Sequence, residues 1–161
     1  MHLIDYDKMR EIIKNGLETH LKVPVIRGNQ TAKQPDYPFV SYNITTIAGA
    51  NNGTWQQHED GIDRKLVRSI WSFSVLAQSW NKSVSLANKT REWIDRAGRL
   101  ILSDNGITVQ SIGEITNRDN ILTVEYECKN GFDVVFYVYD ETANTIEQSS
   151  YIESAETIRT E

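Results

Sequence analysis

The sequence has 161 residues, of which 39% are hydrophobic and 24% are charged, with four tryptophans and seven tyrosines. This length and composition suit a single globular domain with a packed core, and they exclude a wholly disordered chain, a collagen-like repeat and a disulfide-stapled miniprotein. The single cysteine, Cys128, cannot form an internal disulfide. No apolar run approaches the roughly 20 residues that cross a bilayer, and the acidic start of the chain is unlike a signal peptide. We therefore expect a soluble protein made in the cytoplasm.

The net charge of −5 is concentrated at one end of the chain. Residues 1–139 carry 16 basic and 16 acidic side chains, whereas residues 140–161 carry six acidic residues and one arginine. Sequence-independent affinity for nucleic acid needs concentrated Lys and Arg, and the sequence has no basic run, so a generic nucleic-acid binder is disfavoured. We expect a single domain over residues 1–139 and an acidic extension over residues 140–161.

The chain begins with a predicted helix. Residues 5–21 have apolar side chains at spacings of three and four, which is typical of an amphipathic helix, and Asp5 is its expected N-cap. Residues 23–26 contain Pro24 and predict a short edge strand, where a missing N–H group is tolerated. The polar residues 27–36 then predict a surface loop.

The period changes to two in the next part of the chain. Residues 38–44 and 66–78 alternate between apolar and polar side chains, which predicts two strands. The glycine-rich residues 48–63 between them predict a long loop or an extended, flexible hairpin.

A second amphipathic helix is predicted over residues 83–102, with Asn81 or Ser83 as its cap and a stop at residues 104–106. Three strand-like runs follow, the last two separated by Asn130-Gly131, a dipeptide typical of hairpins. Short turns between them predict an antiparallel meander over residues 107–115, 122–128 and 132–139. The fold class is therefore α+β: a mostly antiparallel sheet flanked by two helices, with a long loop or hairpin and an extended C-terminal tail.

Catalytic, cofactor and metal sites are not indicated by any motif. His2, His20 and His58 have no metal-ligand spacing, and His58 beside two acids reads as a solvated loop residue. Cys128 alternates with apolar residues, which favours a buried thiol over a nucleophile. The chain has neither a Gly-x-Ser-x-Gly elbow nor a glycine-rich phosphate loop. We predict a protein that is not an enzyme and has no cofactor.

The candidate sites are instead surfaces for other proteins. Trp55 and Gln56 lie in the polar loop, and Trp55 is either an interface anchor or a cap on the sheet edge. Arg118 and Asp119 lie in a polar turn, whose plainer interpretation is a tight turn with Arg118 paired to a neighbouring carboxylate. The charged residues of the second helix are either a solvated face or half of a subunit interface: Arg91, Glu92, Asp95, Arg96 and Arg99.

Several short runs together resemble the neck and tail terminator proteins of tailed phages. They occur in the family's order and span roughly residues 35–139: DYPFVSYNI at 36–44, SFSVLA at 72–77, ANKTREW at 87–93, NRD at 117–119, YE at 126–127 and GFDV at 131–134.

This resemblance implies an α+β subunit of a hexameric ring in the virion, made in the host bacterial cytoplasm. The ring caps the finished tail tube, stops its polymerisation and presents a surface to neck or connector proteins, while DNA passes through the lumen without sequence-specific binding. Such a subunit needs two different complementary faces, because a closed ring is a heterologous assembly. Our hypotheses are that residues 48–63 reach the lumen or the tube and that residues 140–161 lie on a neighbour.

Two alternatives stay open. One is another ring component of the neck, such as a stopper or a tail-completion protein. The other is a small α+β enzyme or ligand-binding domain with a pocket between sheet and helices, lined by Trp71, Phe73 or Trp93.

Overall fold

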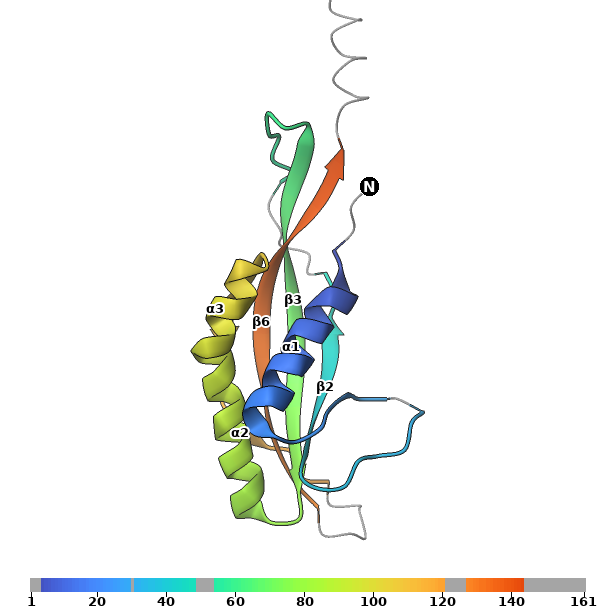
Figure 1. The fold of residues 1–161 in the computed structure, drawn as a ribbon, viewed down its shortest axis with the longest axis vertical. Coiled ribbons are helices and arrows are strands. Elements are labelled where there is room, and N and C mark those ends of the chain that lie inside the picture. The colour runs from blue at the N-terminus through green and yellow to red at the C-terminus, as the bar shows by residue number, and fades with distance from the viewer. Residues whose placement is uncertain (1–3, 30, 49–53, 121–126, 144–161) are drawn as a thin grey trace, which may run out of the picture.

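The computed structural model describes residues 4–29, 31–48, 54–120 and 127–143 (Figure 1). Most of the predicted strand 122–128, the middle of the predicted loop and the tail beyond residue 143 lie outside these ranges. The elements in chain order are α1 (Tyr6–Leu21), β1 (Val25–Arg27), β2 (Phe39–Thr46), β3 (Ile62–Ala77), α2 (Trp80–Asp95), α3 (Ala97–Asp104), β4 (Ile107–Ile112), β5 (Thr116–Asn117) and β6 (Cys128–Ala143).

The strands form one sheet with the order β1-β2-β3-β6-β4, and β5 pairs with β6 next to β4. Only β1 and β2 are parallel; the other pairs are antiparallel. The longest ladder joins β3 and β6 over their whole length, from Ile62 opposite Ala143 to Ala77 opposite Cys128. The predicted α+β class with a mostly antiparallel sheet is confirmed.

One face of the sheet carries the core. Alternate residues of β3 and β6 are buried on this face, and α1, α2 and α3 all contribute to the same apolar cluster. An aromatic group lies at its centre, where Trp71 stacks on Tyr42 with a centroid distance of 5.3 Å and meets Phe136 edge-on at 5.8 Å. Since large apolar and aromatic side chains dominate burial energy, this face holds the molecule together.

The first helix forms as predicted. Asp5 is its N-cap, and the carboxylate accepts the Lys8 N–H at 2.9 Å, which satisfies one of the unpaired donors of the first turn. Its apolar residues Met9, Ile13 and Leu17 are buried. The helix ends at Lys22, whose φ of 59° places it in the left-handed region, and the predicted edge strand follows as β1.

The predicted single helix over residues 83–102 is wrong. The chain begins a helix earlier, at Trp80 with Ser79 as the N-cap, and breaks at Arg96 with φ −116° and ψ −93°. The break lets α3 fold back on Trp93: a Cβ built on Gly98 would lie 2.6 Å from the Trp93 ring. Helical periodicity continues through residue 102 because both α2 and α3 pack an apolar face on the same core.

The predicted hairpin at Asn130-Gly131 is also wrong, because both residues lie inside β6 opposite Val75 and Ser74. Asn130 is buried, and its side-chain amide donates to Ser83 Oγ at 3.0 Å, while Ser83 donates to the Val75 carbonyl at 3.0 Å. This polar chain ties α2 to the sheet. Of the predicted three-strand meander, the first strand is present as β4 and the last lies within β6, which pairs with β3 on one side and with β4 and β5 on the other. The middle strand lies mostly outside the described residues.

The two longest strands extend beyond the helix-covered part as a two-stranded ribbon (Figure 1). The β2 ladder ends with Thr46 opposite Ile70, and β4 begins with Ile107 opposite Val138. Beyond these points β3 and β6 pair with each other. We call residues 54–66 and 139–143 the arm and the rest of the described chain the body. β3 therefore starts at Ile62, before the predicted residue 66, and β6 continues to Ala143, past the predicted end at residue 139.

Candidate interaction surfaces

Trp55 lies on the arm. Its neighbour Gln56 exchanges two backbone hydrogen bonds with Arg64, of 2.7 and 2.9 Å, so this part of the predicted loop folds back along β3. The Lys65 ammonium lies 5.9 Å from the centroid of the Trp55 ring, at the outer limit of a cation–π contact. The ring is nevertheless 43% exposed. Trp55 thus lies against a strand edge with much of its surface uncovered, and its role as an interface anchor stays a prediction.

One arginine links the two strands of the arm to its turn. The Arg64 Nη2 atom lies 2.9 Å from Asp60 Oδ2, and Nε lies 2.9 Å from Glu141 Oε1. The hydrogen bond from Arg64, helped by one from the Ile62 N–H, lowers the pKa of Asp60, and the two carboxylates raise the pKa of Arg64. These exposed ion pairs orient the arm but add little stability.

Exposed apolar side chains accompany the arm, and sequence analysis missed them. Leu66 and Tyr139 lie opposite each other in the ladder and are 37% and 53% exposed, and Ile47 at the end of β2 is 61% exposed. Alternation marks Leu66 as a strand residue but gives no information on whether another layer covers that position.

The charged residues of the predicted second helix serve two purposes. Arg91 donates to the backbone carbonyls of Gly113 and Ile112 at 3.0 and 3.1 Å, and Arg99 donates to the Val109 carbonyl at 2.9 Å. Both guanidinium groups thereby cover β4, the edge strand of the sheet. Unpaired edge carbonyls invite pairing with another strand, so these arginines also protect the edge.

The other three charged residues lie along the outer surface of α2. Glu92 and Arg96 form an ion pair of 3.5 Å with both side chains mostly exposed, and Asp95 pairs with Arg99 at 3.1 Å. These residues therefore form an exposed charged face, and two of its arginines also contact residues of β4 and the turn after it. Its use as a subunit interface stays a prediction.

Arg118 acts as a clamp across the sheet. Its guanidinium passes over β6 and donates to Ser72 Oγ at 2.7 Å and Ser74 Oγ at 3.2 Å on β3, and it also meets Asp133 Oδ1 at 3.0 Å. Gly131 makes room for it, because a Cβ at that position would lie 2.8 Å from Arg118 Nη1 and 2.3 Å from the Phe73 carbonyl oxygen.

The turn around Arg118 is the one that the plainer interpretation predicts. The Asp119 N–H donates to Asn117 Oδ1 at 2.7 Å, which is an Asx turn, and Asp119 Oδ1 accepts the Lys129 N–H at 2.6 Å. The expected pairing of Arg118 with a neighbouring carboxylate is confirmed by Asp133. The interface role of Arg118 and Asp119 stays a prediction.

A further apolar area lies on the helices. Leu100 and Ile101 on α3 are 70% and 44% exposed, and Trp80 at the start of α2 is 56% exposed. A shallow hollow between α1 and α3 is lined by Ile12, Gly16, His20, Trp93 and Ile101, among others. Its lining contains no acidic residue, and Trp71 and Phe73, which the ligand-pocket alternative places around a cavity, are fully buried in the aromatic group.

The described residues contain no group of three His, Cys, Asp or Glu side chains that would hold a metal ion. His58 is exposed, Cys128 is half-buried at the start of β6, and His2 lies outside the described ranges. Within the described part of the chain, no helix is long and apolar enough to cross a membrane.

The described residues form a projecting arm, a charged helix face and several exposed apolar side chains. These features are typical of a protein that acts by binding other proteins. A family model described as "Phage neck terminator protein" matches residues 6–160. The chain therefore belongs to the phage neck terminator family, which is a family of structural proteins of the virion. No curated protein matches the chain.

Proposed function

We propose that this protein forms a hexameric ring at the head-proximal end of the tail tube, ends polymerisation of the tube and joins the tail to the neck. Membership of the neck terminator family supports this role. The observation that carries it is the arm: a two-stranded ribbon that bears Trp55, Leu66 and Tyr139 with much of their surface exposed. Such a ribbon is marginally stable in water by itself, so its apolar side chains need another protein surface.

A ring also needs two different faces on each subunit. The arm supplies one, at the end of β3 that is farthest from α2. The exposed surface of α2 and α3 supplies the other, with the charges of Glu92 and Arg96 and the apolar side chains of Leu100 and Ile101. The two faces differ in chemistry, which suits a head-to-tail contact that repeats around a ring.

Growth of the tail tube stops, in this proposal, because the two ends of the ring differ. One end of the ring binds the last layer of tube subunits, and the other end does not match a tube subunit, so growth stops there. The neutral charge of residues 1–139 suits a lumen through which DNA slides, because a strongly basic lining would hold the phosphates.

The test is to mix the purified protein with purified tail tubes. We expect protein at one end of each tube by electron microscopy, no further growth when tube subunits are added, and a six-fold mass by light scattering on or off the tube. A protein that binds only tails that are already terminated would be a stopper or a tail-completion protein. A monomer that ignores tubes would contradict the proposal and favour the ligand-binding alternative.

A variant pair sharpens the test. The double change Leu66→Ser with Tyr139→Ser removes exposed apolar surface from the arm, so capping of tubes should be lost while the urea midpoint of the monomer is almost unchanged. Trp80→Ser is the matched control, because Trp80 is similarly exposed but lies at the start of α2, just after the end of β3 that is opposite to the arm. Capping by the arm variant would show that the arm does not make this contact.

A further inference from the structure

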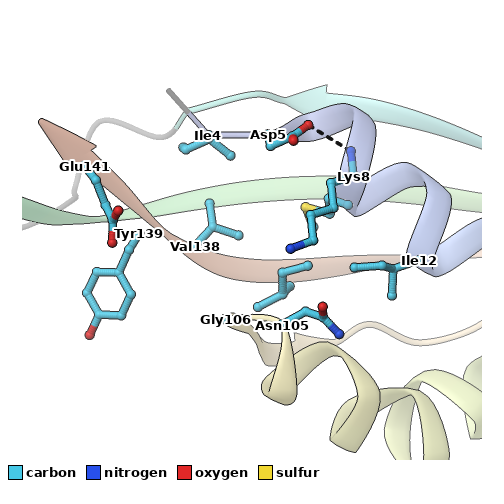
Figure 2. Close-up of a pocket in the computed structure, with 11 residues that line it drawn as sticks. Ile4, Asp5, Lys8, Ile12, Asn105, Gly106, Val138, Tyr139 and Glu141 are labelled. Carbon is cyan, nitrogen blue, oxygen red and sulfur yellow. Dashed lines mark hydrogen bonds between the residues drawn. The ribbon is translucent and has the colours of Figure 1, made fainter. Parts of the chain in front are cut away.

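A groove lies where the arm joins the body (Figure 2). The first turns of α1 form one wall, the turn at Asn105 and Gly106 forms another, and Tyr139 and Glu141 project from β6 at its end. Its floor is apolar: Met9, Ile107 and Val138 are at most 5% exposed. The groove therefore offers apolar contacts beside the last residues of β6.

The strand at this groove has a free edge. Arg64 directs its own N–H and C=O to Gln56, on the side away from β6, so its partner Glu141 directs its N–H and C=O away from β3. The same alternation applies to Tyr139 and Ala143. Lower on β6 the equivalent groups are used: the Asp133 carbonyl accepts the Gly113 N–H at 2.7 Å. In the described part of the chain, no strand pairs with this side of β6 beyond Val138.

One cation at the groove lacks a partner of opposite charge. The Asp5 carboxylate caps α1, and Glu141 is bound to Arg64. The Lys8 ammonium extends into the groove in Figure 2 and forms no ion pair with any described residue. The groove thus combines an apolar floor, an open strand edge and an uncompensated positive charge, which suits an extended peptide with apolar and acidic residues.

The other edge nearby is closed. Arg91 and Arg99 cover carbonyls of β4, as described above. An added strand would therefore pair with the arm portion of β6, on the side of β6 where β4 pairs with it in the body.

We propose that the groove binds the C-terminal segment, residues 144–161, of a second copy of this chain as an added strand. This inference rests on the proposed ring, and it names a contact that closes it. The 18 residues after Ala143 contain apolar residues at 146, 151, 152 and 158 and acids at 147, 153, 156 and 161. Fully extended, they span about 60 Å, which is enough to reach a neighbour. The family match runs to residue 160, so the segment belongs to the family's shared sequence.

The alternative occupant is the same chain folded back on its own β6. That arrangement needs a tight reversal directly after Ala143. Residues 144–161 contain neither glycine nor proline, and among them only Asn144 is of a type that readily accepts positive φ. The common two-residue hairpin turns need either positive φ at both central residues or a glycine at the first, which this segment does not supply. Binding to a neighbour needs no reversal.

Disulfide trapping between two differently marked chains tests this contact. Both full-length chains carry Cys128→Ser. One carries Asn105→Cys at the groove, and the other carries Ile146→Cys or Ile152→Cys in the C-terminal segment. After mixing and mild oxidation, a disulfide between the two chains should appear. Thr31→Cys, exposed in the loop between β1 and β2 and outside both proposed subunit faces, is the matched control and should give none.

Charge reversal gives a second measurement. Lys8→Glu should lower the yield of cross-chain disulfide roughly threefold to fivefold, since it replaces an attractive pair by a repulsive one. An acid in the first turn is favourable for a helix, so α1 should remain folded. Lys33→Glu, an exposed lysine in the loop between β1 and β2 and outside both proposed subunit faces, is the control and should leave the yield unchanged.

Light scattering of the same samples separates the two proposals. A ring with the cross-chain disulfide supports both. A ring without the cross-chain disulfide overturns the present inference and leaves the proposed function standing. A monomer that neither forms the disulfide nor caps tubes overturns both.

Discussion

The body and the arm are built from the same two strands, but different forces hold them. In the body, β3 and β6 place Trp71, Phe73 and Phe132 against three helices with no exposed surface. In the arm the same strands carry Arg64, Lys65 and Tyr139, and an ion pair of 2.9 Å joins Arg64 on β3 to Glu141 on β6. Burial of large apolar side chains stabilises far more than exposed ion pairs do.

The body and the arm therefore suit different roles, the one stability and the other contacts with other proteins. In the body, helices of the same chain cover the apolar face of the sheet. The arm has backbone edges and apolar side chains that its own chain, as far as it is described, leaves uncovered. A region of this kind is suited to contacts between subunits, because its exposed side chains can pack against a partner protein.

The largest expected effect compares the two regions through tryptophan. Trp71→Ala should lower the free energy of unfolding by about 3–5 kcal/mol, because it removes a fully buried ring from the aromatic group. Trp55→Ala should change it by at most about 0.5 kcal/mol, since the ring is 43% exposed on the arm. Urea unfolding measures both. Similar losses for the two variants would show that the arm shares the core of the body.

The next effect tests the crossing of Arg118 over β6. Gly131→Ala should destabilise the body by about 1–3 kcal/mol, because the added methyl group must displace the Phe73 carbonyl or the Arg118 guanidinium. Gly113→Ala is a milder control, since its nearest atom would lie 3.1 Å away. If Gly131→Ala were as stable as the native chain in urea, the close packing of these groups would be wrong.

A smaller loss is expected when the clamp itself is removed. Arg118→Met should cost about 1–2 kcal/mol, because Ser72 and Ser74 lose a charged donor and the Ser74 side chain is buried. Arg96→Met removes an arginine whose side chain is 76% exposed, so it should cost less than about 0.5 kcal/mol. Equal thermal midpoints for the two variants would argue against the clamp.

The smallest effect is a pH-dependent loosening of the arm. The pKa of Asp60 is lowered from its ordinary value of 3.8 by the hydrogen bond from Arg64. A lowered pKa in the folded arm means that this contact is complete above the ordinary value and is lost as the pH falls through the lower one. Hydrogen exchange at the Arg64 amide should therefore gain an acid-dependent step below about pH 4.

Asp60→Asn is the control for this step. It removes the titrating group and should abolish the acid-dependent change at Arg64 while leaving exchange in the body unaltered. A step that persists in Asp60→Asn would assign the loosening to another carboxylate.

Much of the fold is readable from periodicity. The helix over residues 5–21, its Asp5 cap, the edge strand after Pro24 and the alternation of Trp71, Phe73 and Val75 all appear in the structure. Each depends on neighbours within a few residues, where sequence patterns are informative. The carboxylate partner of Arg118 was predicted in kind, although not the reach of Arg118 to β3.

The wrong predictions have a common cause. Asn130-Gly131 looks like a turn from its local chemistry, but the glycine is there because Arg118 and Phe73 leave no room for a side chain. Residues 83–102 look like one helix, but the chain breaks at Arg96 so that Gly98 packs on Trp93. In both cases a contact between distant residues outweighed the local preference.

By itself, the sequence determined the α+β class, the positions of most helices and strands and the resemblance to neck terminators. It also determined that residues 1–139 are neutral and that residues 140–161 are acidic. Only the tertiary structure decided which polar and apolar residues remain available to a partner. Arg91 and Arg99 are directed to an edge strand, whereas Tyr139 and the edge of β6 stay open. Periodicity records which face of an element is apolar, but whether that face is covered depends on elements far away in the chain.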